Sequence, residues 1–195
     1  MLVPLILASA SPIRRHMLEC AGVDYRAIPA DLDESAVKSA NPEAGVAAAA
    51  LADAKALHVS RDNPDDWVIG SDSIVACDGR MLDKPKDRSD AEEHLRFFSG
   101  RDMALTSAVS LARGGAIVWR FTDQAHLRVR HLSDEFIAHY LDTEWPDVSY
   151  CVGVFRMEGR GVQLFESIEG SHFTILGMPL FPLLGALRER GVIAQ

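Results

Sequence analysis

The chain has 195 residues, of which 48% are hydrophobic and 25% are charged, and these proportions are ordinary for a globular protein with a real core. The formal net charge of −8 argues against general binding to nucleic acid or to a membrane surface, so we expect neither as a partner. An anionic ligand would therefore have to be held by a local cluster of basic side chains.

The N-terminal half alternates between strand and helix patterns. Ser11 followed by Pro12 is typical of a helix start, and Gly22 is typical of a helix end, so a helix is expected between them. Asn41-Pro42-Glu43 opens a second helix. In chain order, the patterns predict a strand over residues 2–8, a helix over 12–21, a strand over 25–29, a polar segment over 31–39, a helix to about residue 59 and a strand over 67–77.

The C-terminal half continues the alternation. Ser89-Asp90-Ala91-Glu92 matches a capping box, and Gly114-Gly115 lies between two strand patterns that form a predicted hairpin. The expected elements are a helix from residue 89 to about 100, strands over 103–111 and 116–122 with 127–129 continuing the sheet, a helix over 133–141, strands over 162–165 and 173–176, and a helix over 179–190. Without repeats or linkers, this order predicts a single α/β domain over residues 1–195, with a mixed sheet.

The cysteines and the N-terminal segment bear on the cellular compartment. Cys20, Cys77 and Cys151 are far apart and form no CxxC pair and no zinc spacing, so we interpret them as packed thiols in a reducing compartment. The apolar run over residues 2–8 has no basic residue before it, and the longest apolar run, over residues 46–52, is too short to span a bilayer. We therefore expect no signal peptide and a cytoplasmic protein.

Two arginines, Arg14 and Arg15, lie in the first turn of the first predicted helix, where the helix dipole favours acidic residues instead. Two interpretations are open. The arginines are solvated side chains on an amphipathic helix, or an anion such as a phosphate binds at this helix start, where Ser9 and Ser11 add hydroxyl and N–H groups. The segment lacks the glycines and the lysine of a P-loop.

Asp72 stands inside the apolar run VIGSDSIV over residues 68–75. A carboxylate in such a run is costly unless it is hydrogen-bonded, paired or bound to a metal ion. It either caps a turn at an exposed strand edge or serves as a metal ligand or general base.

Three further charged residues have ordinary explanations when taken singly. Lys55 can be a lysine at the rim of the core, Lys84 precedes a proline that extends its backbone, and Glu34 can be a solvated acid. Taken together, the carboxylates and cations are the groups that phosphoryl chemistry with Mg²⁺ needs; they are Glu34, Asp72, Arg14, Lys55 and Lys84.

Eight motifs in a fixed order resemble the Maf family of nucleotide pyrophosphatases over nearly the whole chain. They are ILASASPIRR at 6–15, DLDE at 31–34, LADAKA at 51–56, VIGSDSIV at 68–75, DKP at 83–85, FFSGR at 97–101, LFESIEG at 164–170 and ILGMPL at 175–180. Because the motifs are collinear, their combination is more specific than any one of them.

The resemblance implies an α/β/α fold with a cleft between two lobes, often as a homodimer. It implies hydrolysis of a nucleoside triphosphate to the monophosphate and pyrophosphate with a divalent cation, Mg²⁺ or Mn²⁺. By resemblance, Asp72 is the catalytic acid that activates water, and Glu34 joins it at the metal. The implied phosphate-binding residues are Ser9, Arg14, Lys55 and Lys84.

Three positions bear on the base of the nucleotide: Ile13, Ser73 and Glu158. The pyrimidine-preferring branch of the family has arginine in place of Ile13 and glutamine in place of Glu158. The 7-methyl-GTP branch shares the GSD motif and the late glutamate, but has an aromatic residue at Ile13 and glutamine at Ser73. Glu158 either is a surface residue in a turn or accepts the N1–H and N2–H₂ donors of guanine, which makes 7-methyl-GTP the leading candidate.

Two other functions are alternatives to hydrolysis of a nucleotide. The family has been associated with septum formation, so a nucleotide-binding regulator of cell division with little catalysis is the alternative, and pyrophosphate release discriminates the two. A general α/β hydrolase has no support, because the chain has no GxSxG elbow.

Overall fold

The structure is a computed structural model that describes residues 4–194. Within these residues seven strands form one mixed sheet in the order β2-β1-β3-β5-β6-β7, with β4 paired to β3. The pairs β1–β2 and β1–β3 are parallel, and β3–β4 and β6–β7 are antiparallel. The strands are β1 (Leu5–Leu7), β2 (Arg26–Ala27), β3 (Trp67–Cys77), β4 (Arg80–Leu82), β5 (Asp102–Arg113), β6 (Ala116–Val129) and β7 (Phe165–Glu169).

Helices are interspersed among these strands along the chain, which confirms the predicted α/β class. They are α1 (Pro12–Cys20), α2 (Glu34–Ala40), α3 (Ala44–Asp62), α4 (Arg88–Phe98), α5 (Asp134–Glu144), the 3₁₀ helix η1 (Arg160–Leu164), α6 (His172–Ile175) and α7 (Leu180–Glu189). In the part of the chain that the structure describes, no helix is both long and apolar enough to cross a lipid bilayer.

The chain divides into two compact units. The first holds the described residues up to Ser73, Thr106–Asp123 and the described residues from His172 onward. The second holds Ile74–Leu105 and Gln124–Ser171. The expected cleft between two lobes stays a prediction.

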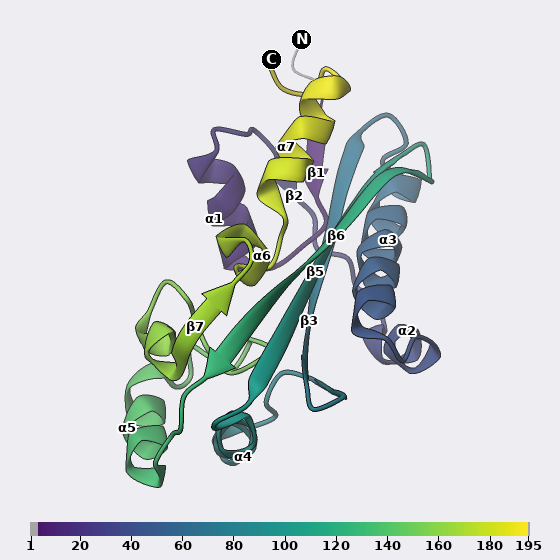
Figure 1. The fold of residues 1–195 in the computed structure, drawn as a ribbon. Coiled ribbons are helices and arrows are strands. Elements are labelled where there is room, and N and C mark those ends of the chain that lie inside the picture. The colour runs from purple at the N-terminus through teal and green to yellow at the C-terminus, as the bar shows by residue number, and fades with distance from the viewer. Residues whose placement is uncertain (1–3, 195) are drawn as a thin grey trace. The chain divides into compact units, whose positions relative to one another are not determined.

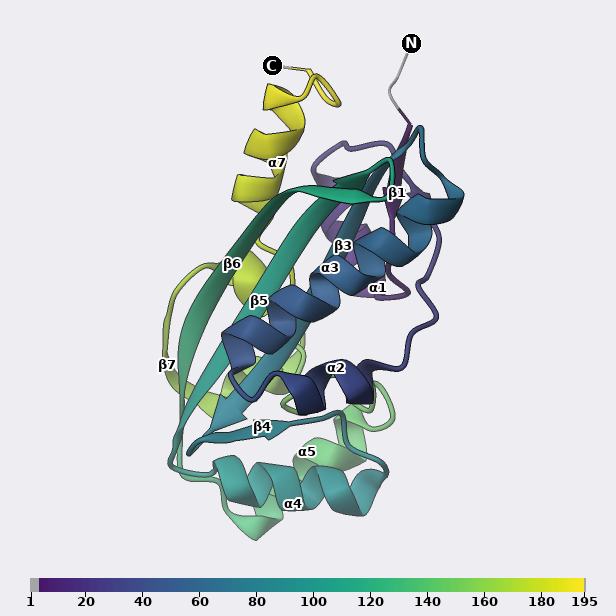
Figure 2. The ribbon, with the colours of Figure 1, turned by 90° about the vertical axis from the view of Figure 1, so that its right-hand side faces the viewer.

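The first unit is layered, with helices on both faces of its strands. Leu5 and Leu7 of β1 pack in one apolar cluster, and Ile6 and Ala8 pack in another, as the alternation of side chains along a strand requires. The cluster of Leu5 and Leu7 includes buried residues of α1 and α7, and the cluster of Ile6 and Ala8 includes buried residues of α3. Figures 1 and 2 show the same arrangement, with α1 and α7 on one side of the strands and α3 on the other.

Gly70 in β3 lets α3 approach the sheet unusually closely. A Cβ atom at this position would lie 2.1 Å from the carbonyl oxygen of Ala52 and 2.6 Å from the backbone nitrogen of Ala56. The glycine therefore seats the α3 backbone against β3 beside Lys55, two residues before Asp72 in the strand.

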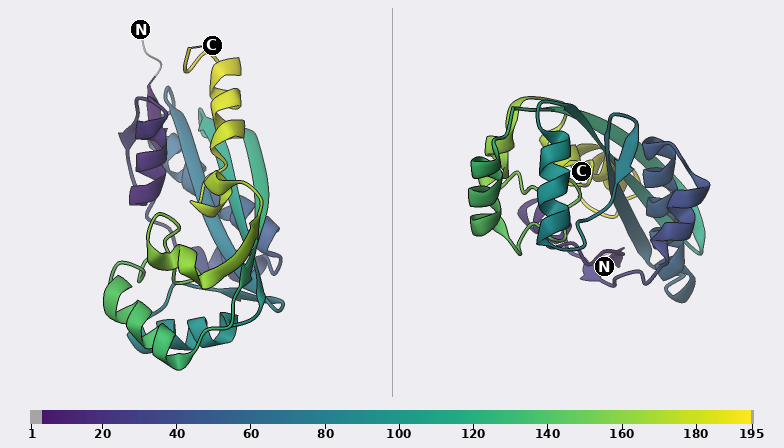
Figure 3. Two further views of the ribbon diagram at one scale, coloured as in Figure 1. Left: turned by 60° about the vertical axis from the view of Figure 1, so that its left-hand side comes forward. Right: turned by 90° about the horizontal axis from the view of Figure 1, so that it is seen from below.

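In the second unit, α4 and α5 lie side by side (Figure 3). Arg96 of α4 joins them through its Nε atom, which lies 2.8 Å from Oδ1 of Asp134 at the start of α5. After α5, Arg156 forms an ion pair at 3.0 Å with the buried Glu144 and so ties the segment before η1 to this helix.

Two of the predicted strands are wrong. Residues 172–175 form a helical turn, because Leu176 N–H and Gly177 N–H donate back to His172 and Phe173. The chain over 160–164 is a 3₁₀ helix instead of the predicted strand over 162–165. Local β propensity over such short stretches is weaker than the tertiary contacts that these residues make.

Several boundaries also differ from the predictions. The polar segment contains α2, and a further short strand, β4, follows the turn after β3. Helix α4 is capped by Asp87, whose side chain accepts from Asp90 N–H at 2.9 Å, and not by Ser89. Cys20 is exposed, so the expectation of a packed thiol fails there, whereas Cys77 is buried.

Candidate active site

Lys55 joins the two carboxylates that the sequence proposed as a pair. Its Nζ atom lies 2.7 Å from Oε1 of Glu34 and 2.6 Å from Oδ1 of Asp72. The side chains of Lys55 and Asp72 are nearly buried, at 11% and 9% exposure, whereas that of Glu34 is 37% exposed. Asp72 is therefore not a turn cap at an exposed edge but a buried, paired carboxylate in β3.

Local structure explains how Glu34 reaches this place. Asp33 caps α2, because its side chain accepts from Ser35 N–H at 3.0 Å, so Glu34 becomes the first residue of a helix instead of a loop residue. Lys55 comes from α3, whose close seat on β3 depends on Gly70. Three elements thus contribute one charged group each.

Arg14 is held from three sides. Its Nε donates to the carbonyl oxygen of Gly177 at 2.8 Å, Nη2 donates to Oγ of Ser73 at 3.0 Å, and Nη1 donates to Oγ of Ser9 at 3.4 Å. Ser9 is buried. Because Ser11 caps α1, the helix begins with Arg14 in its first turn, as predicted.

The guanidinium of Arg14 interacts electrostatically with the carboxylates of Asp72 and Glu34. Burial lowers the pKa of the Arg14 guanidinium, and the carboxylates of Asp72 and Glu34 act in the opposite direction. The first cause is desolvation of the cation, and the second shows that both acids lie within electrostatic reach of it.

Arg15 has different partners, although it is the next residue in the helix. Its Nη2 donates to the carbonyl oxygen of Ala10 at 3.3 Å. Successive residues are about 100° apart around a helix, so the two arginines face different surroundings.

Two of the charged side chains, Glu34 and Asp72, carry oxygen ligands of the kind that a divalent cation prefers. Within residues 4–194 no group of three or more His, Cys, Asp or Glu side chains could hold a metal ion. Glu34 and Asp72 nevertheless place one oxygen each within 2.7 Å of the same ammonium nitrogen. Mg²⁺ is commonly held by one or two carboxylates together with substrate phosphates and water, so this pair fits a cation that binds with its substrate.

The predicted site residues fall into two groups. Ser9, Arg14, Glu34, Lys55 and Asp72 belong to the first unit and are connected there by the contacts and charges described above. The predicted base-reading residues of that unit are Ser73, which contacts Arg14, and Ile13, which is half-buried on α1.

Lys84 and Glu158 belong to the second unit and are exposed. Both act on the half-buried thiol of Cys151. The pKa of Cys151 is raised to about 11, chiefly by burial and also by Glu158, while Arg156 and Lys84 act in the opposite direction. The thiol is therefore protonated at neutral pH, as expected for a packed cysteine.

Sequence reasoning missed three groups near Arg14: the hydroxyl of Ser107, the backbone of Thr174 and the carbonyl of Gly177. Ser107 is a polar residue in the largely apolar β5, the same signal that drew attention to Asp72 in β3. The carbonyl of Gly177 carries no such signal, because every residue has one.

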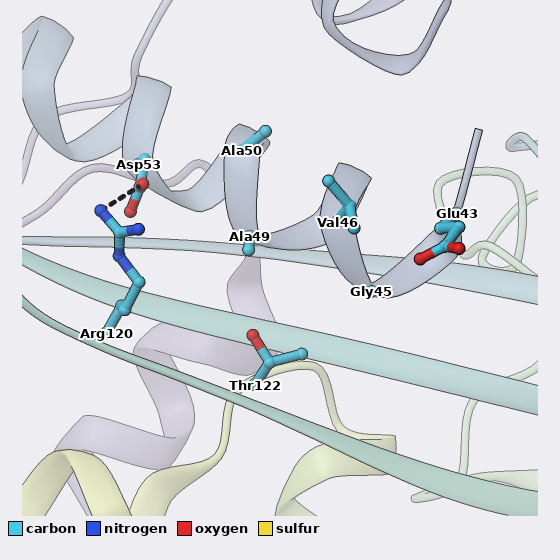
Figure 4. A pocket seen from close by; sticks show the side chains of 8 residues that line it. All are labelled: Glu43, Gly45, Val46, Ala49, Ala50, Asp53, Arg120 and Thr122. Carbon is cyan, nitrogen blue, oxygen red and sulfur yellow. Dashed lines mark ion pairs between the residues drawn. The ribbon is translucent and has the colours of Figure 1, made fainter. Parts of the chain in front are cut away.

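An open pocket of about 480 Å³ lies elsewhere in the first unit, between α3 and β6 (Figure 4). Val46 and Ala49 line it from α3, and Arg120 lines it from β6 and forms a 3.0 Å ion pair with Asp53. None of the predicted site residues lines this pocket.

Comparisons with known proteins found similar sequences over nearly the whole chain. A family model described as "Maf-like protein" matches residues 4–190. A 7-methyl-GTP pyrophosphatase of Rhizobium etli is 47% identical over 193 residues, covering 97% of each chain. A nucleoside triphosphate pyrophosphatase of Nitrobacter winogradskyi is 44% identical over 193 residues, covering 98% of this chain and 96% of the relative.

A solved structure is similar in fold. The Ham1 protein of Staphylococcus aureus matches with a TM-score of 0.50 at 14% identity, covering 96% of this chain and 99% of that one. At this identity the likeness concerns the fold alone.

Proposed function

The chain belongs to the Maf-like protein family, and we propose that it hydrolyses a nucleoside triphosphate to the monophosphate and pyrophosphate. The observation that carries the proposal is Lys55, which lies between Glu34 and Asp72 while Arg14 stands within electrostatic reach of both acids. The three unpaired cysteines fit the reducing conditions of the cytoplasm, where we place the reaction.

The leading substrate is 7-methyl-GTP. The name of the Rhizobium etli relative supports it, and so does the acidic side chain of Glu158, which could accept two donors from a guanine edge. The positive charge of a 7-methylated ring would favour a carboxylate further.

The residues of the first unit take these roles. Water attacks the α-phosphorus and breaks the bond to the bridging oxygen of the pyrophosphate group, which leaves as pyrophosphate. Oδ1 of Asp72 is held by Lys55, so we assign the proton of the attacking water to Oδ2 of the same carboxylate. Arg14 and Lys55 offset the negative charge that the leaving phosphates carry, and the hydroxyl oxygen of Ser9 accepts from Arg14.

Glu34 and Asp72 would hold Mg²⁺ or Mn²⁺ together with the substrate phosphates. When bound, such an ion neutralises phosphate charge and polarises the phosphorus–oxygen bonds. The family resemblance implies that Lys84 binds the phosphates as well, and that role stays a prediction.

The test of the function is a pyrophosphate-release screen over standard and modified nucleoside triphosphates, with Mg²⁺, with Mn²⁺ and with a chelator. We expect release with either ion, loss of release with the chelator and the highest kcat/KM for 7-methyl-GTP. Nucleotide binding without pyrophosphate release would favour the regulator of cell division instead.

We expect Arg14 to matter more than Arg15. Arg14→Ala removes a charge-assisted contact worth about 1.5–3 kcal/mol, so kcat/KM should fall roughly tenfold to 150-fold. Arg15→Ala is the matched control, because Arg15 contacts the carbonyl of Ala10 in place of Ser73 and Gly177. A larger loss for Arg15→Ala than for Arg14→Ala would contradict the assignment.

Glu158→Gln tests the reading of the base. A bidentate contact discriminates between bases by roughly 1–3 kcal/mol in nucleic-acid readout, so the ratio of kcat/KM for 7-methyl-GTP to that for UTP should fall about tenfold or more. Glu144→Gln is the control: it is the same exchange in the same unit, at a glutamate that pairs with Arg156. Equal losses on both substrates for Glu158→Gln would mean that this side chain supports its loop and reads no base.

A further inference from the structure

A set of hydroxyl and carbonyl groups surrounds the guanidinium of Arg14. They are contributed by Ser73, Ser107 and Gly177. Oγ of Ser73 lies 3.0 Å from Nη2 of Arg14 and 2.8 Å from Oγ of Ser107. The Gly177 carbonyl accepts from Nε of Arg14 at 2.8 Å. All of these groups belong to the first unit.

The direction of these hydrogen bonds follows from the number of protons available. Oγ of Ser107 donates its single proton to the carbonyl oxygen of Thr174 at 2.7 Å, so it can only accept from Ser73. Ser73 has one proton and two acceptors, Oγ of Ser107 at 2.8 Å and the Gly177 carbonyl at 3.1 Å, and the shorter distance favours Ser107. Because a guanidinium only donates, the oxygen of Ser73 presents a lone pair to Arg14.

The chain of bonds thus runs one way, from Arg14 through Ser73 and Ser107 to the Thr174 carbonyl. Hydrogen bonds aligned in one direction polarise each other and strengthen the acceptor at the start of the chain. Ser107 and Thr174 are fully buried, so water does not compete with these bonds. The acceptor that faces Arg14 is therefore fixed in place.

The position of Gly177 depends on its being a glycine. Its φ of +104° is one that other residues rarely adopt. A Cβ atom here would lie 3.2 Å from Oγ of Ser73 and 3.5 Å from Nη2 of Arg14. A side chain would press on the two groups that meet there.

We propose that Ser73 and the Gly177 carbonyl, supported by Ser107, are positioning groups that hold the guanidinium of Arg14 for the phosphates of the substrate. The contacts with Ser9, Ser73 and Gly177 use three of the five N–H donors of Arg14. The remaining donors, one on each Nη atom, suit a bidentate contact with a phosphate. This inference rests on the proposed function and gives Ser73 a role other than the base reading expected from its place in the family.

The first arm of the test measures Arg14 without any substrate. In the nucleotide-free protein, the Nε–H resonance of Arg14 is identified by its loss in Arg14→Lys, and its hydrogen exchange is followed by NMR. Ser73→Ala should speed this exchange several-fold, and Ser107→Ala should do the same to a smaller degree. Ser110→Ala is the matched control, because Ser110 is a buried serine of the same strand as Ser107 and donates to Asp53 instead.

The second arm measures pyrophosphate release with 7-methyl-GTP and UTP. Loss of a precise position can cost up to about 100-fold, so Ser73→Ala should lower kcat/KM roughly tenfold to a hundredfold on both substrates, with their ratio unchanged. Ser73→Thr keeps the hydroxyl and should restore most of the activity, and Ser110→Ala should match the wild type.

The outcomes separate this proposal from the proposed function. If the wild-type protein releases no pyrophosphate from any nucleotide, the function fails, but the exchange of the Arg14 Nε–H still tests the positioning. Wild-type exchange in both Ser73→Ala and Ser107→Ala overturns the inference. A change in the 7-methyl-GTP to UTP ratio without a change at Arg14 also overturns it and returns Ser73 to base reading.

Discussion

Turnover by the Asp72→Asn variant is expected to fall by roughly 10²–10⁴-fold, the usual cost of losing a general base. Asparagine keeps the shape of the side chain and can still accept from Lys55, but it carries no negative charge and cannot take a proton from water. Because Lys55 keeps its second partner, Glu34, the fold should survive the exchange.

Asp53→Asn is the matched control for this experiment. Asp53 lies on α3 of the same unit, accepts from Ser110 at 2.6 Å and pairs with Arg120, away from the carboxylate pair. Circular dichroism checks that both variants are folded before turnover is compared. If Asp72→Asn keeps near-wild-type turnover, the proton is taken elsewhere.

Gly70→Ala is expected to lower the free energy of unfolding by about 3 kcal/mol or more, because overpacking against a backbone cannot be relieved by a side-chain rotation. The new methyl group would meet the carbonyl oxygen of Ala52 at 2.1 Å, so α3 must move away from β3 and take Lys55 with it. The melting temperature should fall by roughly 6–12 °C for a chain of this size, and turnover should fall with it.

Gly45→Ala is a control for the same kind of exchange. Gly45 lies in the first turn of α3, and a Cβ atom there would meet nothing within 4 Å. The melting temperature of the Gly45→Ala variant should therefore equal or exceed that of the wild type. Thermal unfolding by calorimetry gives both values. Equal melting temperatures for the two variants would show that α3 is not seated by Gly70.

The sequence predicted the elements that have strong local signals. Strand β3 has the predicted bounds, because a long apolar run predicts a buried strand and the turn at Asp78-Gly79 ends it. Helix α1 begins where Ser11 and Pro12 place it. The segment over 172–175 was mispredicted, because its β-branched and aromatic residues are held in a helical turn by contacts with distant parts of the chain, such as Thr174 with Asp123.

Some features of the candidate site could likewise be predicted from the sequence, and others depend on the fold. Charges in unexpected places, such as Asp72 in an apolar run and Arg14 at a helix start, are visible in the sequence. The partners of Arg14 are not, because they depend on how β3 lies in the sheet beside β5 and on a backbone carbonyl that is 163 residues away in the chain. The sequence grouped Glu34 with Asp72 by their chemistry, and the family resemblance added their roles at a metal ion, but spacing alone does not give their shared contact with Lys55.

The two carboxylates beside Lys55 differ in how firmly the protein holds them. Asp72 belongs to a buried strand, whereas α2, which carries Glu34, has no buried residue in its seven. Segments with little buried surface open locally at a small free-energy cost, far below that of global unfolding. The carboxylate of Asp72 is therefore held rigidly, whereas that of Glu34 can move with α2. The amide hydrogens of α2 should therefore exchange with solvent sooner than those of β3. A ligand that binds Glu34 would slow the exchange in α2, so this exchange rate would report whether the site is occupied.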